Sequence, residues 1–567
     1  MLKTSTRWFY KIAAYALLTM WLVFAVAVMG LRYAVLPHIG EYREAIAASF
    51  SQSVQQPIAI GGIEAGWHGL RPYLVLRDVT VHDRQGRPAL SLQQVEGTLA
   101  WWSLLVGEIR LYSLEISAPV LALRRDAAGH FFVGGVEISQ DSSEKGFADW
   151  LLGQHRVIIR DAVISWNDEK RQAPPLVLKN FNFRLENSGS HHRFGMRSVP
   201  PAQLAGPLDI RGDLKGADAK DLLAWRGAIY AALERTDLAA WRAWFDLPFD
   251  LQRGYGEVRL WLNVEREGLA DVTAEVSLSD IDLRWAAELP RLDLVSVSGR
   301  LGGRFSAPGY ELRARKLTFA SRDGVVFPPV DMLARFTPAA GKKAESGEVR
   351  LSGLDLGALA ALAAHLPFSA EQRALLAESR PRGTLPELSL KWDGAWQSPQ
   401  SFSAKGRFDA LGVEAFAPNQ VASGRKLPGF SGMSGNFEAS EKGGALTLNS
   451  RGASASFPGL FDEALAFDTL TTQLTWQVHP ADVEFHLSKA GFANADLAGN
   501  AHGSYRYTPG KPGEIDFSGQ LTRADARQTG RYIPLVVGND TRDWLNHSIL
   551  SGHSQDVRLR LKGNLAD

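Results

Sequence analysis

The chain alternates between apolar and polar residues over most of its length, which predicts β-strands with one apolar and one polar face. One arrangement recurs: two apolar residues at alternate positions, two mostly polar residues, then two further apolar residues at alternate positions. Its copies are Leu74 and Leu76 with Val79 and Val81, Ile109 and Leu111 with Leu114 and Ile116, Leu176 and Leu178 with Phe181 and Phe183, Val276 and Leu278 with Ile281 and Leu283, Leu312 and Ala314 with Leu317 and Phe319, Val349 and Leu351 with Leu354 and Leu356, and, more weakly, Val157 and Ile159 with Ala162 and Ile164.

The two-residue insert reverses the alternation, so a continuous strand keeps both apolar halves on one face only if it bends or bulges there. The inserts suit a bend: they include Arg77-Asp78, Lys179-Asn180, Ser279-Asp280 and Ser352-Gly353. A sheet that bends at the same place in successive strands curls into a trough. The alternative interpretation is a set of β-sandwiches with hairpin turns at the inserts.

The predicted fold is therefore mainly β: an elongated, curled antiparallel sheet that forms a hydrophobic groove, with a few short covering helices. Helical patterns cover Asp237–Phe245, Leu356–Leu366, Ser369–Glu378 and Asp540–Leu550. Stretches rich in Gly, Ser, Pro and charge predict loops at Gly134–Gly146, Asn187–Gly206, Pro338–Gly347, Pro418–Gly429 and Thr508–Gly513.

An uncharged apolar segment of twenty residues, Ile12–Leu31, precedes this β-rich region. At 1.5 Å per residue a helix of this length spans about 30 Å, the thickness of a bilayer's hydrocarbon core. Lys3, Arg7 and Lys11 lie before it, and basic flanks stay in the cytoplasm. We interpret the segment as an uncleaved transmembrane anchor; a cleaved signal peptide is the competing interpretation.

These patterns divide the chain into four parts. Residues 1–11 form a basic cytoplasmic N-terminus, 12–31 the transmembrane helix, 32–56 an amphipathic juxtamembrane segment and 57–567 a β-groove region outside the cytoplasm. The strand pattern continues to the last residues, so we expect the groove region to be incomplete at the C-terminus.

Composition and motif searches argue against catalysis. The chain has 567 residues, with 62 basic and 61 acidic side chains and no cysteine. No nucleophile elbow, phosphate-binding loop or dinucleotide fingerprint is present, and His191-His192 lies in a polar stretch rather than at metal-ligand spacing. No basic cluster with interleaved aromatic residues suggests nucleic-acid binding. We expect no enzyme activity, no cofactor, no metal site and no nucleic-acid partner.

Several segments resemble one known family. Residues 56–79, with the sequence QPIAIGGIEAGWHGLRPYLVLRDV, are similar to the N-terminal region of AsmA-like envelope proteins of the YhdP type. Residues 118–131, 543–552 and 556–565 resemble the same family, as does the single preceding helix. Members are about twice as long as this chain. The resemblance implies a repeating-β-groove fold, a single-pass anchor in the inner membrane of Gram-negative bacteria, and a periplasmic body.

It also implies a role in carrying phospholipids along an apolar groove toward the outer membrane or its proteins, without catalytic residues. The repeat positions are the candidates for the groove lining: Leu74, Leu76, Val79, Val81, Ile109, Leu111, Val276, Leu278, Leu312 and Leu317. The sequence leaves open whether these side chains face the groove or a covering helix. Two other readings also remain open: a periplasmic scaffold that assembles outer-membrane proteins or surface polymers, and, with less support, an envelope hydrolase.

Overall fold

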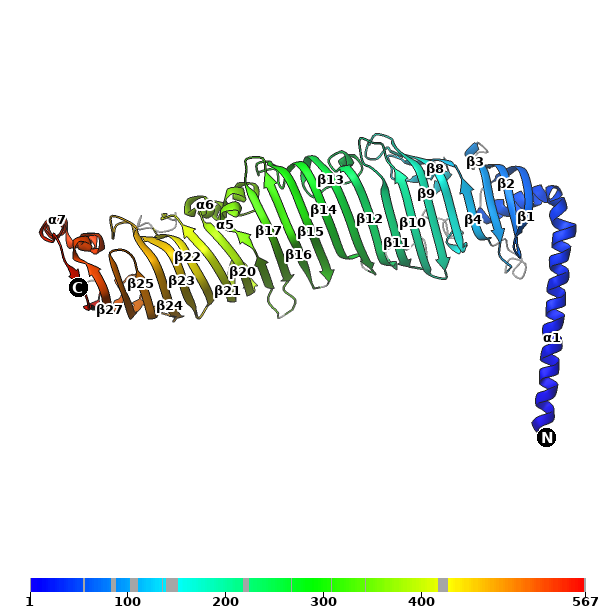
Figure 1. Ribbon diagram of the computed structural model, residues 1–567. Coiled ribbons are helices and arrows are strands. Elements are labelled where there is room, and N and C mark those ends of the chain that lie inside the picture. Colours follow the sequence, from blue (N-terminus) through cyan, green and yellow to red (C-terminus); the bar gives the residue numbers. More distant parts are fainter. Residues whose placement is uncertain are drawn as a thin grey trace. The chain divides into compact units, whose positions relative to one another are not determined.

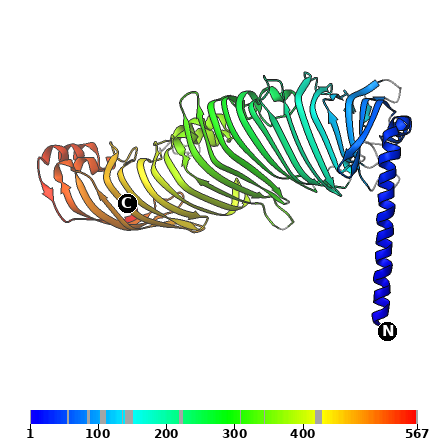
Figure 2. The same cartoon turned by 45° about the vertical axis from the view of Figure 1, so that its right-hand side comes forward.

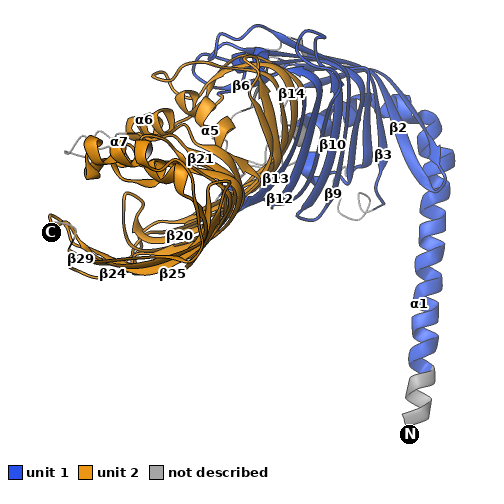
Figure 3. Cartoon of the chain, turned by 60° about the vertical axis from the view of Figure 1, so that its left-hand side comes forward, with its two compact units in different colours: residues 1–246, 257–270 blue, residues 247–256, 271–567 orange. Residues whose placement is uncertain are grey.

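The computed structural model describes residues 2–54, 57–82, 88–101, 111–134, 136–138, 151–217, 224–266, 268–306, 308–341, 343–416 and 427–564. Contacts divide the chain into two compact units (Figure 3). Unit 1 comprises residues 1–246 and 257–270, and unit 2 comprises residues 247–256 and 271–567. The fold is mainly β, with an N-terminal apolar helix and a few short helices, as the alternation predicts.

Unit 1 begins with a long run of helical turns: α1 (Leu2–Gly30), the π-helical turn η1 (Leu31–Val35), the 3-10 helix η2 (Leu36–Tyr42) and α2 (Arg43–Val54). In the described part of the chain, this run contains the one helix that is long and apolar enough to cross a membrane. Its apolar window is not buried by other parts of the protein. The predicted segment 12–31 lies inside it.

The strands of unit 1 lie side by side in Figure 1. They are β1 (Ile58–His68), β2 (Arg71–His82), β3 (Pro88–Leu99), β4 (Leu111–Ser117), β5 (Val120–Arg125), β6 (Phe131–Val133), β7 (Val136–Ile138), β8 (Arg156–Asp168), β9 (Leu176–Ser188), β10 (His191–Val199), β11 (Leu208–Lys215) and β12 (Arg226–Asp237). Successive neighbours pair antiparallel, except that β4 and β5 both pair parallel with β8. The short 3-10 helix η4 (Ala240–Ala243) follows β12.

Two strands, β13 (Asp250–Glu265) and β14 (Gly268–Arg284), contribute residues to both units. The remaining strands belong to unit 2 and pair antiparallel (Figure 2). They are β15 (Leu292–Ser306), β16 (Gly309–Ser321), β17 (Val326–Thr337), β18 (Ser346–Ser352), β19 (Leu354–Asp355), β20 (Arg382–Ala395), β21 (Ser398–Val413), β22 (Gly429–Ser440), β23 (Gly443–Ser456), β24 (Leu465–Val478), β25 (Val483–Ala493), β26 (Leu497–Tyr507), β27 (Glu514–Asp525), β28 (His553–Ser554) and β29 (Val557–Asn564).

The helices of unit 2 lie along one end of its strands (Figure 3). They are α5 (Leu356–Leu362), η5 (Ala363–His365), α6 (Ala370–Ser379), η6 (Ala526–Tyr532), η7 (Leu535–Val537) and α7 (Asn539–Ser548). Side chains cap three of them: Asp355 accepts a hydrogen bond from the Ala358 amide at the start of α5, Ser369 forms a capping box with Gln372 on α6, and Asp525 accepts from the Arg527 amide on η6.

The predicted bends are present in both units. The second residue of the insert adopts a left-handed backbone conformation at Asp78 (φ 52°), Asn180 (φ 48°), Asp280 (φ 49°) and Gly353 (φ 78°). Asp, Asn and Gly tolerate this conformation better than other residues. Pairing resumes beyond the bend, as in β2 and β3, where Arg77 pairs with Gln94 and Val79 with Leu92.

The bend changes which alternate positions of a strand are buried, as the reversed alternation of the sequence predicts. On β2, Leu74 and Leu76 are buried before the bend, and Val79 is buried after it. On β8, Val157 is buried before the bend at Asp161 (φ 50°), and Ala162 after it. Both halves of each strand therefore present their apolar side chains to the same face.

Several predicted boundaries were wrong. The expected loop Asn187–Gly206 contains β10, whose inward positions include the buried polar residue His192. The expected helix Asp237–Phe245 is only the 3-10 turn η4. The expected loops at 134–146 and 418–429 lie mostly outside the described residues, whereas residues 508–513 do connect β26 to β27.

Candidate functional site

The strand pairing of unit 2 aligns apolar residues into continuous rows across the sheet. In the first apolar row, each residue is paired with the next on the neighbouring strand. Its members are Ala274, Leu301, Ala314, Met332, Leu351, Leu388, Gly406, Phe437, Leu446, Leu474, Leu487, Gly503, Phe517 and Leu561. No polar side chain interrupts this row between β14 and β29.

A second apolar row runs beside the first, two residues farther along each strand and on the same face. Its members are Val272, Gly303, Leu312, Ala334, Val349, Leu390, Ala404, Ala439, Gly444, Trp476, Phe485, Tyr505, Ile515 and Gly563. At about 4.8 Å between neighbouring strands, each row extends for about 60 Å. We call the surface formed by the two rows the apolar face of unit 2.

This apolar face is not covered by a second protein layer. Every leucine and aromatic residue of the two rows stays at least partly exposed, and Leu301, Leu312 and Leu561 are 39%, 41% and 49% exposed. A continuous exposed apolar surface of this extent is unusual for a protein face in contact with water alone, and such surfaces mark sites of interaction.

Glycines let several rings lie flat on the apolar face. A β-carbon at Gly406 would lie 2.7 Å from the ring of Phe437, its cross-strand partner. At Gly347 it would overlap the indole of its partner Trp392. The absence of a side chain at these glycines is therefore what allows the opposite ring to rest on the backbone.

The opposite face of unit 2 carries a ladder of alternating charges. Arg304 lies 3.4 Å from Asp271, Arg335 bridges Glu311 and Glu348, and Lys391 lies 3.5 Å from Glu348. The hydrogen bond from Arg335 to Glu311 holds the pKa of Glu311 below its ordinary value. Charged side chains make this face favourable to water, whereas the other face of the same sheet is apolar.

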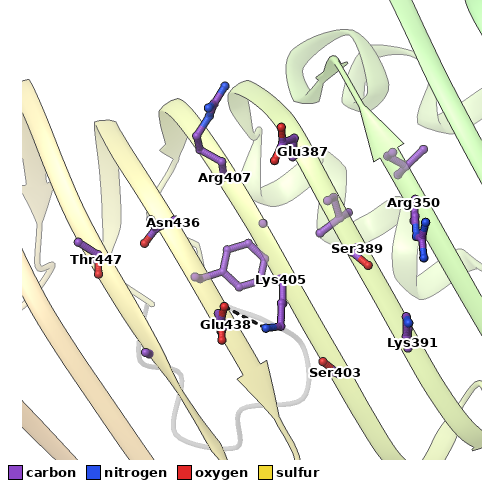
Figure 4. Close-up of a pocket in the computed structure, with 15 residues that line it drawn as sticks. Arg350, Glu387, Ser389, Lys391, Ser403, Lys405, Arg407, Asn436, Glu438 and Thr447 are labelled. Atoms are coloured by element: carbon purple, nitrogen blue, oxygen red, sulfur yellow. Dashed lines mark hydrogen bonds and ion pairs between the residues drawn. The ribbon is translucent and has the colours of Figure 1, made fainter.

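A hollow of about 890 Å³ lies among the middle strands of unit 2. Most of its lining side chains are polar and come from β18 and β20–β23; they include Arg350, Lys391, Lys405 and Arg407 (Figure 4). Lys405 forms an ion pair with Glu438 at 3.0 Å. Its polar side chains alternate along the strands with those of the apolar face, and four residues of the first row also line it: Leu351, Leu388, Gly406 and Phe437.

Unit 1 contains two equivalent rows. The first comprises Ile63, Leu76, Val95, Ile116, Ile159, Phe183, Met196, Ile210 and Ala231. The second comprises Ala65, Leu74, Gly97, Leu114, Val157, Leu185, Phe194, Gly212 and Ile229. Both rows cross the parallel junction between β4 and β8 without a polar member.

The juxtamembrane segment covers the first part of these rows. Leu36 is 7% exposed within the core cluster of unit 1, and Ile39, Ile46, Ala47 and Phe50 pack against that cluster. Row residues of the same cluster, such as Leu74 and Leu76, are buried. The predicted amphipathic segment 32–56 thus lies against the apolar face of unit 1 through its described residues.

The candidate lining residues fall into different surroundings. Four are buried in the core cluster of unit 1: Leu74, Leu76, Val79 and Leu111. Val81, Val276, Leu278 and Leu317 are partly buried, and Leu312 is an exposed member of the second row of unit 2. Ile109 lies outside the described residues.

The row residues of β20–β27 were not among the candidates, because the two-part repeat is less regular there. A simpler signal marks them: Leu388, Leu390 and Trp392 alternate strictly with Ser389 and Lys391. Strict alternation without the insert identifies these strands equally well.

A protein-family model described as YhdP protein matches residues 1–567. The chain belongs to the YhdP family. No curated protein and no solved structure matches it. YhdP family membership agrees with the envelope-associated role that the resemblance implied, while the geometry of the apolar face has to supply the chemistry.

Proposed function

We propose that this YhdP family chain is an inner-membrane-anchored periplasmic lipid-transfer protein that carries phospholipids along its apolar face toward the outer membrane. The observation that carries the proposal is the pair of uninterrupted, uncovered apolar rows of unit 2. In this proposal the N-terminal helix is the single membrane span, with its basic end in the cytoplasm.

The dimensions of the face suit acyl chains. A lipid tail is about 15 Å long, half of a bilayer's hydrocarbon core of about 30 Å, so a row of about 60 Å exceeds the length of several tails. Each CH₂ group exposed to water costs about 0.8 kcal/mol, which prevents an unassisted two-tailed lipid from crossing water at a useful rate. A continuous apolar face lowers that cost at every step, while the charged head group stays in water.

The proposed transfer needs no catalytic step, and the described residues include no group of three His, Cys, Asp or Glu side chains placed to hold a metal. An apolar row has no intrinsic direction, since its members are chemically alike along its length. Net flow then requires a gradient or an energised partner, which we place in other proteins.

Site-specific photo-crosslinking tests the proposal. Leu388 and Leu446 are partly buried members of the first row, and their neighbours Ser389 and Thr447 point to the opposite face. A photoreactive amino acid at Leu388 or Leu446 should give phospholipid adducts in cells, and the same residue at Ser389 or Thr447 should not. Leu76 is a poorer position, because it is 7% exposed and lies in the core cluster with the juxtamembrane segment.

Adducts confined to the polar positions, or an absence of adducts at all four, would overturn the proposal. Crosslinks to outer-membrane proteins at the strand edges, without lipid adducts, would favour the periplasmic scaffold instead.

A further inference from the structure

The two ends of the strands in unit 2 are built differently. At one end, which we call the helix rim, residues 354–381 and 526–550 lie along the sheet. Contacts fasten this rim: Tyr532 donates a hydrogen bond to Asp496 at 3.0 Å, Asn494 donates to the Tyr532 hydroxyl at 2.9 Å, and Arg531 pairs with Asp496 at 2.7 Å. The Glu414 amide donates to the Ser379 carbonyl at 2.8 Å.

The opposite end, which we call the hairpin rim, carries no helix among the described residues. It includes the turns between β15 and β16, β17 and β18, and β20 and β21. On the apolar side of this rim, the strand pairing aligns one more row: Phe305, Tyr310, Phe336, Gly347, Trp392 and Phe402. We call it the aromatic row.

The aromatic row lies between the apolar rows and water. Phe305 and Tyr310 are 46% and 44% exposed, and Trp396 beyond the row is 52% exposed and packs edge-on against Trp392 at 4.8 Å. The charge ladder of the other face runs at the same level, through Arg304 and Lys391. Aromatic side chains with a polar atom, such as Tyr and Trp, favour such a boundary between apolar and aqueous surroundings.

Trp392 is a largely buried member of the aromatic row. It is 9% exposed, and its Nε1–H has no hydrogen-bond acceptor among the described residues. A buried donor without a partner is costly. Because this nitrogen is itself covered by protein atoms, Trp392 contributes its ring to the aromatic row and not a donor that a lipid can reach.

From these two rims we infer the orientation of the bound lipid: its acyl chains lie on the first and second apolar rows, and its glycerol and phosphate lie at the aromatic row, so that the head group leaves the face at the hairpin rim. The inference rests on the proposed function. It assigns the aromatic row the role of positioning the polar part of the lipid, and it leaves the helix rim as the side toward which the tail ends point.

Two photoreactive phosphatidylethanolamines test the orientation on the full anchored chain in vesicles. One carries its photoreactive group on the head group, and the other carries it at the end of an acyl chain. After irradiation, peptide mapping should place head-group adducts in the hairpins at residues 305–310 and 392–402. Tail adducts should fall on the apolar rows and the helix rim.

Variants distinguish a role of the aromatic row in positioning the head group from a role in folding. Replacing Phe305 and Tyr310 together by Ser should reduce head-group adducts at least fivefold and leave tail adducts in place. Leu70→Ser, in the exposed turn between β1 and β2 of unit 1, is the matched control and should change neither label.

Head-group adducts at the helix rim, with tail adducts near the hairpins, would overturn the orientation while leaving lipid binding intact. An equal distribution of head-group adducts along both rims would overturn it as well. An absence of both kinds of adduct would contradict the proposed function itself.

Discussion

Two carboxylates placed across the apolar face of unit 2 should stop lipid passage. Leu388 and Leu390 lie on β20 in the first and second rows, so the double variant Leu388→Asp and Leu390→Asp interrupts both rows on one strand. Replacing each leucine removes about 1 kcal/mol of favourable apolar contact with an acyl chain, because only the exposed part of the side chain can contact lipid. Each carboxylate that an acyl chain covers costs at least about 1 kcal/mol more.

These contributions add up to about 4 kcal/mol, which slows passage about a thousandfold. The assay is transfer of a fluorescent phospholipid from vesicles that carry the anchored chain to acceptor vesicles. The control Ser389→Asp with Ser403→Asp adds the same charge to the polar face of β20 and β21 and should transfer normally. Circular dichroism and limited proteolysis establish that both variants fold. A folded Leu388→Asp, Leu390→Asp variant that transfers lipid at the unchanged rate would refute the account of the rows.

Three further outcomes are expected. Gly347→Val displaces the indole of Trp392, which lies over that glycine, and should destabilise unit 2 by about 1–3 kcal/mol. The measurement is the urea midpoint of unfolding, which should fall. A midpoint equal to that of the unmodified chain would show that the ring does not need the space. Phe50→Asp should open the juxtamembrane segment to protease in unit 1, whereas Ala48→Asp, on the exposed side of α2, should not; equal protection of both variants would contradict the packing. The pKa of Glu311 is lowered in the folded chain, so the ionised carboxylate stabilises the fold fully above the unfolded pKa of about 4.3, and this stabilisation is lost as the pH falls through the lower folded pKa. Glu311→Gln should therefore lose less stability in acid than the unmodified chain. An unchanged dependence of stability on pH would exclude the stabilisation by Glu311.

Many of the bent strands could be predicted from the sequence because two independent signals coincide at several inserts. The alternation reverses there, and a residue that tolerates the left-handed conformation stands at the second position. At Asp78 and Asp280 both signals are present, and both residues have positive φ. Lys316 also adopts φ 49°, although its residue type gives no such signal, so here the reversal alone locates the bend.

The failures have equally local causes. On β10, the inward positions are occupied by His192, Phe194 and Met196, and a histidine at the first of these hides the apolar alternation. His192 is buried because its ring nitrogens lie 2.7 Å from the Asn187 side chain and 3.1 Å from the Gly216 carbonyl oxygen. Such partners come from other strands and loops, which the local pattern does not reveal.

The division of the face into covered and open parts could not be predicted either. Leu76 and Leu388 have similar sequence surroundings, but Leu76 belongs to the core cluster against which the juxtamembrane segment packs, and Leu388 stays partly exposed. The difference arises from a segment about thirty residues earlier in the chain, which packs onto unit 1. Alternation identifies the face of a strand, whereas the covering layer depends on tertiary structure.

Native mass spectrometry of the full chain, purified with its anchor in mild detergent, shows whether the apolar rows hold phospholipid. We expect mass additions that correspond to intact phospholipids. These additions should persist in the variant Ser389→Asp with Ser403→Asp and be strongly reduced in the variant Leu388→Asp with Leu390→Asp. A chain that carries no phospholipid, or one that carries the same amount in both variants, would contradict this expectation.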